Sequence, residues 1–564
     1  MWRRRFSTGT ASALTEKKWD ALVVGGGHNG LTAAAYLARA GLSVAVLERR
    51  HLIGGAAVTE ELIPGFKFSR CSYLHSLLRP TIVRHRQTFL FVNVFGYCDA
   101  GTYILIRELE LARHGMKLLK PIAASFTPCL DGRYLLLGMN DRQDYLEISK
   151  FSRLDADAYP RYERKLQKFC KFMDFLLDSR TPETFHGGSC FNNQLRDKWH
   201  KSVFWASCLR HAVSLGQKDM VEFVDLLLSP TSKVLNQWFE SDVLKATLAG
   251  DAVIGSMVSI QTSGSGYVLL HHVMGETDGD RNVWSHVEGG MGSISVAISN
   301  AAKEAGAHIV TGAEVSQLMI EDAGIVNGVL LADGKHVHSS VVLSNATPYK
   351  TFMGTTKINV AVDRLPQFQC CKLSHTEVGP QHTATIRLSA ESMEEINSAC
   401  QDAWNGIPSQ RPVMEMTIPS SLDKTISPPG KHVVSLFTQY TPYKPSDGTW
   451  EDPTYRESYA RRCFNLIDEC APNFSSSVIG YDMLTPPDLE REFGLTGGNI
   501  FHGAMGLDSL FLMRPVKGWS HHRTPVKGLY MCGSGSHPGG GVMGAPGRNA
   551  ALVALHDLTN SPPS

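Results

Sequence analysis

The strongest constraint on this chain is a glycine-rich turn between an apolar strand and a helix of small residues near its start. Residues 20–55 read DALVVGGGHNGLTAAAYLARAGLSVAVLERRHLIGG. The apolar run at 21–24 is typical of a buried parallel strand, and residues 31–40 are predicted to form a helix that ends at Gly41. A second strand is predicted over 43–47. This strand–turn–helix–strand unit predicts an α/β domain that binds a dinucleotide.

Each glycine of the turn has its own physical role. Gly25 permits the tight turn after the strand, Gly27 lets the backbone approach a pyrophosphate, and Gly30 allows close helix–strand packing. The helix N-terminus supplies N–H donors and a partial positive charge. Glu48, 18 residues beyond Gly30, is placed to accept hydrogen bonds from a ribose 2′-hydroxyl. A glycine-rich turn without a nucleotide is disfavoured, because the strand, the helix, the second strand and the acid are all in place.

Two further stretches favour FAD over NAD. Glu48 is followed by Arg49 and then by the pair Gly54 and Gly55, and this ERRHLIGGAA stretch resembles the start of FAD-dependent amine oxidases and phytoene desaturases. Near the other end, residues 528–558 read GLYMCGSGSHPGGGVMGAPGRNAALVALHDL, which resembles the C-terminal flavin-binding segment of the same group. An NAD-dependent dehydrogenase has no reason to place a second glycine-rich strand–loop–helix there. FAD is therefore the expected cofactor.

A third block, residues 284–348, is expected to return the chain to the flavin domain. We predict a helix over 293–305, followed by strands at 308–311, 315–321, 326–331 and 336–343. In the resembled group, the residue matching Val315 lies against the adenine through its backbone. The resemblance thus implies a cofactor-binding set taken from three segments: Gly25, Gly27, Gly30, Glu48, Arg49, Gly54, Gly55, Val315, Gly533, Gly535 and Gly544.

The resemblance covers nearly all of residues 20–558 and implies a Rossmann-like α/β FAD-binding domain with an interleaved α+β substrate domain. The FAD-binding segments are expected at 19–125, 284–348 and 486–564, and the substrate domain at 126–283 and 349–485. Two stretches depart from the family. Residues 84–106 are an extra segment, interpreted as a translated intron or, less favoured, a membrane-touching loop, and the connection 348–357 is about two dozen residues short.

Composition excludes several other classes. The chain has 55 Lys and Arg against 54 Asp and Glu, which removes the electrostatic argument for nucleic-acid binding. Its 12 cysteines form no CxxC pattern, so neither a metal site nor a redox cysteine pair is indicated, and the adjacent Cys370 and Cys371 are interpreted as incidental. Residues 1–18 are Arg-rich and acid-poor up to Glu16, which predicts a transit peptide and a location in the mitochondrial matrix. A basic terminus with no targeting role is the alternative.

The expected chemistry is hydride transfer from a small apolar or amine-bearing substrate to FAD. His502 and His272 are the candidate catalytic residues, although each histidine is more often structural. Arg514 is interpreted first as structural, paired with an acid, and second as a contact to an anionic substrate, while His537 is interpreted as a flavin contact or a helix cap. The substrate and the electron acceptor are not readable. The main alternative is a FAD-stabilised, weakly catalytic or non-catalytic protein that acts by binding a mitochondrial partner. On either interpretation no transmembrane span is expected, and peripheral contact with a membrane is left open.

Overall fold

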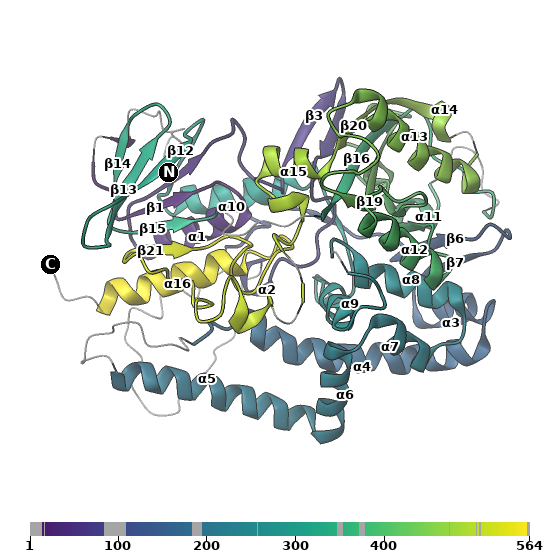
Figure 1. The fold of residues 1–564 in the computed structure, drawn as a ribbon, viewed down its shortest axis with the longest axis horizontal. Helices are drawn as coiled ribbons and strands as arrows, with labels where there is room; N and C mark the ends of the chain where they lie inside the picture. Colours follow the sequence, from purple (N-terminus) through teal and green to yellow (C-terminus); the bar gives the residue numbers. More distant parts are fainter. Residues whose placement is uncertain are drawn as a thin grey trace.

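Five short apolar strands from three distant parts of the chain form one parallel sheet (Figure 1). Its order is β11-β2-β1-β15-β21, and Leu22 of β1 lies opposite Ala45 of β2 and Val342 of β15. Burial on both faces accounts for the continuous apolar runs. The strands are β1 (Ala21–Val24), β2 (Val44–Glu48), β11 (His308–Thr311), β15 (Val342–Ser344) and β21 (Leu529–Met531).

This computed structural model describes most of the chain. The described residues are 14–15, 17–83, 109–182, 194–256, 258–346, 353–371, 378–472, 474–503, 505–506 and 509–560. The extra segment 84–106, most of the expected transit peptide and part of the short connection 348–357 lie outside them. No helix in the described part of the chain has the length and apolar character needed to cross a bilayer.

Three helices pack with the parallel sheet: α1 (His28–Arg39), α10 (Gly292–Glu304) and α16 (Ala545–Asn560). The first strand and the helix after the turn are confirmed, but α1 begins at His28 rather than at residue 31. The helix begins earlier because Gly27 is its extended N-cap and Gly30 already lies in its first turn.

The single strand predicted over 336–343 is wrong. The chain instead forms β14 (His336–His338), which joins an antiparallel sheet with β12 (Val315–Ile320) and β13 (Val326–Leu331), and then enters β15. The side chain of Ser339 separates the two strands. Its hydroxyl accepts a hydrogen bond from Val341 N and donates one to Val341 O, which is a turn-forming pattern.

A seven-stranded mixed sheet forms the second layer, in the order β20-β16-β19-β18-β17-β6-β7. The β17–β6 pair is parallel and the other pairs are antiparallel. Helices α12 (Met393–Trp404) and α13 (Pro453–Cys470) contribute to the cores beside it. The strands are β6 (Ser125–Pro128), β7 (Tyr134–Leu137), β16 (Met353–Val362), β17 (Thr385–Leu388), β18 (Val413–Thr417), β19 (His432–Pro442) and β20 (Val478–Leu484).

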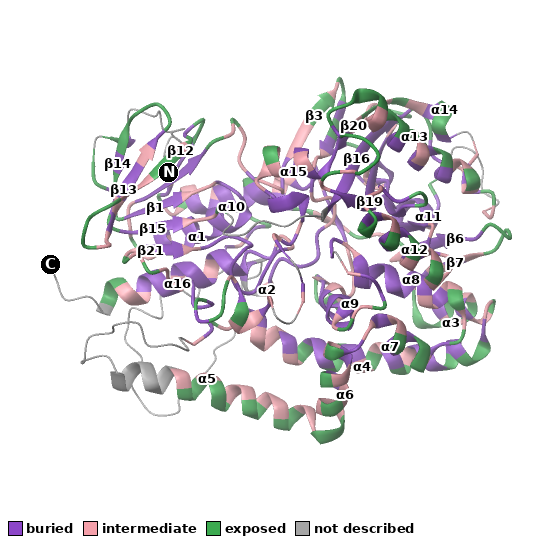
Figure 2. Cartoon of the chain, viewed as in Figure 1, coloured by how far each residue is buried: buried purple, intermediate pink, exposed green. Residues whose placement is uncertain are grey.

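A helical layer lies beneath the second sheet, and Figure 2 shows buried residues concentrated where the layers meet. Its long helix α4 is capped by Ser152, whose hydroxyl accepts from Asp155 N. The layer comprises α3 (Asp141–Ser149), α4 (Arg153–Asp178), α5 (Gln194–Leu215), α6 (Gln217–Leu228), α7 (Thr231–Trp238), α8 (Asp242–Val253) and α9 (Ser265–Val273).

Short ribbons and helices complete the connections. The ribbons pair β3 (Thr59–Ile63) with β4 (Phe66–Ser69), β5 (Leu118–Leu119) with β10 (His286–Val287), and β8 (Glu276–Thr277) with β9 (Asp280–Arg281). The short α-helices are α2 (Pro80–Val83), α11 (Pro380–Thr383), α14 (Phe474–Ser477) and α15 (Pro486–Phe493).

Leu14 belongs to the folded domain although it falls inside the range 1–18 expected for a transit peptide. Its side chain is buried beside Trp19, and its carbonyl accepts a 3.0 Å hydrogen bond from Trp19 Nε1. Removing residues 1–18 would take a core side chain away. Processing that spares the fold must therefore cut before Leu14.

Arg79 joins the N-terminal segment to the helical layer. The side chain is 4% exposed, and it donates to Asp174 and Asp178 of α4 at 2.7 Å each. Removing a guanidinium held between two carboxylates in this way is strongly destabilising, because Asp178 then loses its countercharge and Asp174 keeps only Arg281.

We expect Arg79→Met to lower the free energy of unfolding by about 3 kcal/mol, because Asp178 loses its buried partner and Asp174 keeps only Arg281. The measurement is urea unfolding followed by circular dichroism. Arg461→Met is the matched control, since Arg461 is 72% exposed in its pair with Glu457 and should change stability by about 0.5 kcal/mol or less. Equal effects of the two substitutions would contradict the role of Arg79.

Candidate dinucleotide cradle and adjoining cavity

The turn between β1 and α1 leaves no room for side chains. Gly25 has φ +96°, and a methyl group at Gly30 would lie 2.1 Å from the carbonyl oxygen of Gly25. No side chain caps α1 at Gly27. The N–H groups of its first turn are thus left without a side-chain acceptor, which is the arrangement that binds phosphate groups.

The second glycine pair lies against this turn. Gly54 N–H donates to Gly26 O at 2.8 Å, and Gly54 forms a bridge with Gly27. A methyl group at Gly54 would lie 2.3 Å from the carbonyl oxygen of Ala57, while one at Gly55 would lie 3.3 Å from Gly27 Cα. The two glycine-containing segments therefore approach each other through their backbones.

Glu48 closes the end of the parallel sheet beside the turn. Its carboxylate accepts from Gly26 N at 2.7 Å and from Arg50 N at 2.9 Å, and the residue is 6% exposed. An ionised carboxylate has about four acceptor positions, so two remain for the hydroxyl groups of a ligand. Val315 begins β12 just after Ala313, whose N–H donates to the carbonyl of Glu48. Val315 thus lies near the same edge.

Arg49 points toward α15. Its guanidinium donates to the carbonyl oxygens of Arg491 and Glu492 at 2.7 and 3.1 Å, where it stabilises the C-terminal end of that helix. The side chain of Arg49 is therefore engaged by the protein, and only its backbone continues the cradle after Glu48.

The C-terminal segment brings a second helix N-terminus to the same place. Gly533 and Gly535 are buried in the turn after β21, and Gly544 immediately precedes α16. A methyl group at Gly547, in the first turn of α16, would lie only 1.9 Å from Asn29 O of α1. Asn29 Nδ2 also donates to Ser534 Oγ at 3.0 Å. Two positive helix ends converge here.

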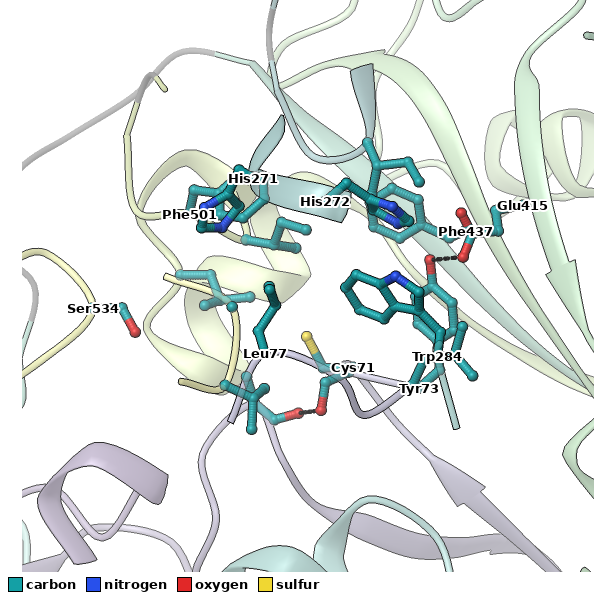
Figure 3. A pocket seen from close by; sticks show the side chains of 18 of the residues that line it. Cys71, Tyr73, Leu77, His271, His272, Trp284, Glu415, Phe437, Phe501 and Ser534 are labelled. Atoms are coloured by element: carbon teal, nitrogen blue, oxygen red, sulfur yellow. Dashed lines mark hydrogen bonds between the residues drawn. The ribbon is translucent and has the colours of Figure 1, made fainter. Parts of the chain in front are cut away.

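A cavity adjoins this cradle and extends to the second sheet (Figure 3). It encloses about 930 Å³ of empty space, including the part open to solvent. Figure 3 shows Ser534 at one side, Glu415 and Phe437 at the other, and Cys71 and Leu77 between them. The lining residues on the cradle side include His28, Ala56, Ser534, Gly541 and Val542.

Most of the polar groups facing the cavity are neutral. Burial lowers the pKa of His28 to about 4 and those of His271, His272 and His502 to about 3, and it raises the pKa of the Cys71 thiol to about 12. His272 and His502, the two candidate catalytic histidines, both line the cavity. Because their pKa values are low, both rings are neutral near neutral pH. Each has a buried Nδ1 without a hydrogen-bond partner.

The charged groups gather at the end of the cavity near the second sheet. Asp251 and Glu415 line the cavity, and Arg387 behind them donates to both, at 2.6 Å to Glu415. Tyr73 OH donates to Glu415 at 2.9 Å, and the ring of His272 stacks on Trp284 with centroids 4.3 Å apart. With both acids ionised, the two carboxylates and the guanidinium carry one net negative charge. An anionic substrate group is disfavoured at this end.

Arg514 is buried without an ion-pair partner among the described residues. Its Nη2 donates to Phe501 O and, at 2.9 Å, to Ser534 O, and burial lowers its pKa to about 10. The interpretation that it pairs with an acid finds no support in the described part of the chain. His537, by contrast, faces Leu176 O of α4 at 3.2 Å.

Lys357 is the buried residue that sequence reasoning missed. It lies in β16, between β20 and β19, donates to Asn359 Oδ1 at 2.7 Å and to Ser435 Oγ, and sits 5.2 Å from the centre of the Tyr73 ring. Burial lowers its pKa to about 7. The one available signal was a lysine inside the apolar run KINVAV.

Comparison with known proteins then defines the relationship. The model for an NAD(P)-binding Rossmann-like domain matches residues 23–83. Over 591 residues, the chain is 47% identical to pyridine nucleotide-disulfide oxidoreductase domain-containing protein 2 of Rattus norvegicus, and the match covers 99% of this chain and 97% of the relative. The chain belongs to this family. The expected family resemblance is confirmed at the level of a whole-length relative.

More distant relatives extend the comparison. One subunit of the limonene dehydrogenase of Castellaniella defragrans is 26% identical over 581 residues, 96% of this chain and 95% of that one. Among solved structures, a putrescine oxidase triple mutant has a TM-score of 0.55 at 14% identity, and the match covers 96% of this chain and 99% of the other. The fold is that of the FAD amine oxidases, and family and fold together point to the FAD-type oxidoreductase superfamily.

The family name contains the word disulfide, but the described residues include no pair of cysteines at the cavity. Cys370 and Cys371 lie 4.0 Å apart at their Sγ atoms and pack against the core of the second sheet. The lining cysteine is Cys71, whose thiol is buried and protonated. A dithiol reaction has no pair of sulfurs to use there.

We expect the substitution Lys357→Met to stabilise the protein most below neutral pH. The folded-state pKa of about 7 lies below the unfolded value of about 10.4, so the unfolded chain binds the extra proton and wild-type stability rises with pH between these values. The stability difference between variant and wild type should shrink by about 1.4 kcal/mol per pH unit above 7.

Urea unfolding at about pH 6 and about pH 9 measures this difference. Lys117→Met is the control, since Lys117 is 64% exposed and its substitution should have an effect that hardly varies with pH. A pH-independent difference for Lys357→Met would show that this amine is charged in the folded protein.

Proposed function

We propose that the chain is an FAD-dependent oxidoreductase of the mitochondrial matrix that takes a hydride from a small, largely apolar substrate. The observation that carries the proposal is the continuity of the cavity with the cradle. Residues of both helix N-termini and of the second sheet line or adjoin one continuous space. The arginines near the start of the chain, Arg3, Arg4 and Arg5, support the location.

The cradle fits FAD in its donors, acceptors and shape. Glu48 would hold the ribose hydroxyls, and the N-termini of α1 and α16 would hold the pyrophosphate. Gly54 and Gly533 keep the backbone free of side chains where a methyl group would meet neighbouring atoms at 2.3 and 2.8 Å. Asn29 Oδ1 is buried without a partner, as expected of a group that awaits a ligand.

Bound FAD would supply the hydride-accepting chemistry, and the protein's residues set its surroundings. Aromatic and aliphatic side chains, among them Leu77, Trp284 and Phe437, line the cavity and would keep water away from a bound apolar substrate. The cavity histidines are neutral, so they orient polar groups by hydrogen bonds. Arg514 holds a fixed positive charge against the carbonyl of Ser534 on the cradle side.

The apolar walls favour an apolar substrate, and the relative named as part of a limonene dehydrogenase supports that choice. One observation favours an amine-bearing substrate as the second candidate. Asp251 and Glu415 face the cavity beside the rings of Tyr73 and Trp284, and carboxylates together with aromatic faces attract ammonium groups. One solved structure with the same fold is that of a putrescine oxidase.

The purified full-length protein should show the near-visible absorption bands of oxidised flavin and release FAD on denaturation. We expect Glu48→Ala to raise the dissociation constant for FAD about tenfold or more, because two acceptor positions for the ribose are lost. Glu61→Ala is the control, since Glu61 is exposed on β3. A folded, colourless protein that takes up no added FAD would sink the proposal and leave the partner-binding alternative.

Anaerobic bleaching of the flavin bands separates the two substrate classes. If amines are the substrates, Glu415→Gln should raise KM for amines about tenfold and leave oxidation of a neutral terpene within about twofold. If apolar molecules are the substrates, no amine bleaches the bands. Glu457→Gln is the control, because Glu457 is exposed on α13 and its carboxylate is not among the groups that line the cavity.

A further inference from the structure

Exposed apolar side chains are concentrated on two neighbouring helices. Seven of the 22 large apolar side chains that are exposed in the described residues fall between 203 and 228, on α5 and α6. They are Val203, Trp205, Leu209, Val213, Val221, Val224 and Leu228. We call these seven side chains the α5–α6 apolar surface. A concentration of this kind marks an interaction site rather than ordinary surface.

The apolar residues of α5 that point outward are not the ones that hold the helix to the protein. Phe204 and His211 pack on Phe175 of α4, with ring centroids 6.0 and 4.4 Å apart. Trp205, Leu209 and Val213 succeed one another at four-residue spacing and are 52%, 66% and 71% exposed. Four-residue spacing places them along one side of the helix, away from α4. Figure 1 shows α5 along the lower edge, outside α4.

The charge of α5 indicates which kind of partner the α5–α6 apolar surface binds. Between residues 201 and 215 the helix carries Lys201 and Arg210 and no acidic residue. Two copies of this stretch packed face to face would bring like charges together, which disfavours self-association. Basic residues beside apolar and Trp side chains are instead the composition of a helix that lies in the interface of an anionic bilayer.

The acidic residues of α6 do not cancel this positive charge, because lysines already neutralise them. Lys165 of α4 donates to Asp219 at 2.7 Å and also to Glu222. Lys233 donates to Asp225 at 2.8 Å. Lys168 and Lys218 also pair with Asp219 and Glu222, so the acids of α6 leave the positive charge of α5 uncompensated.

We propose that the α5–α6 apolar surface docks the protein on an anionic lipid bilayer, with α5 lying in the plane of the interface. Its apolar side chains would enter the acyl boundary while Lys201 and Arg210 reach the headgroup phosphates. No described helix is long and apolar enough to cross the bilayer.

The position of α6 connects this surface to the cavity. α6 packs on α9 so closely that a methyl group at Gly266 would lie 2.2 Å from Leu226 O. The same helix α9 contributes Val268, His271 and His272 to the cavity lining. One helix therefore separates the docking surface from the cavity. This step rests on the proposed function: an apolar substrate dissolved in the membrane would then be only one helix away from the cavity.

Vesicle flotation tests the docking surface independently of flavin chemistry. The full-length protein should float with vesicles of phosphatidylcholine containing about one fifth phosphatidylglycerol, and less with phosphatidylcholine alone. Binding should weaken as salt rises, because the basic residues are screened. The double substitution Leu209→Asp with Val213→Asp should reduce the partition coefficient at least about tenfold.

Leu154→Asp is the matched control, because Leu154 is 68% exposed on α4, outside the surface, and its substitution should leave flotation unchanged. Circular dichroism verifies that the variants fold. The proposal is overturned if the folded wild type fails to float with anionic vesicles, or if both variants float equally. It is also overturned if size-exclusion chromatography shows a dimer that the double substitution dissociates, since the surface would then join two copies. Loss of flotation with intact flavin bands would leave the proposed function standing.

Discussion

The pairing of β1 with β15 and of β15 with β21 is the interaction on which the rest of the structure depends. These strands come from the beginning, the middle and the end of the chain, and their parallel ladder sets the end of β1 beside the turn after β21. Only then do the N-termini of α1 and α16 meet at Asn29 and Gly547. The positive ends of both helices face one small volume, and that position is unfavourable unless an anion occupies it.

The second sheet and the helical layer complete the site in a different way. They contribute walls rather than a cradle, and those walls are apolar with neutral polar groups set among them. The carboxylates that line the cavity are confined to one end, where Arg387 binds both of them and offsets one of their two charges. A cavity arranged like this discriminates by shape and by exclusion of water, while the directional hydrogen bonds are left to the cradle.

Sequence patterns were most informative where local geometry needs particular residues. The turn at Gly25 to Gly30 and the strand before it were predictable, because only glycine fits where Cβ would meet backbone at 2.1 Å. The break at Ser339 was missed, since two short apolar strands in different sheets read as one run. The cavity was not predictable in detail either. Its residues come from many separate stretches, and Lys357 or Arg387 shows its surroundings only once the strands are paired.

The parallel sheet cannot be completed until the last part of the chain has left the ribosome. Its outermost strand, β21, and the helix α16 that covers α1 come from residues 529–560, so the glycine-rich turn is synthesised long before the elements that close over it. Until then, the edge of β15 and the apolar face of α1 stay exposed and open to wrong pairing. A chain cut short before β21 keeps an intact GxGxxG turn, yet it lacks the second of the two helix N-termini and has an unprotected sheet edge. The candidate cradle is therefore complete only when the last 36 or so residues of the chain have been made.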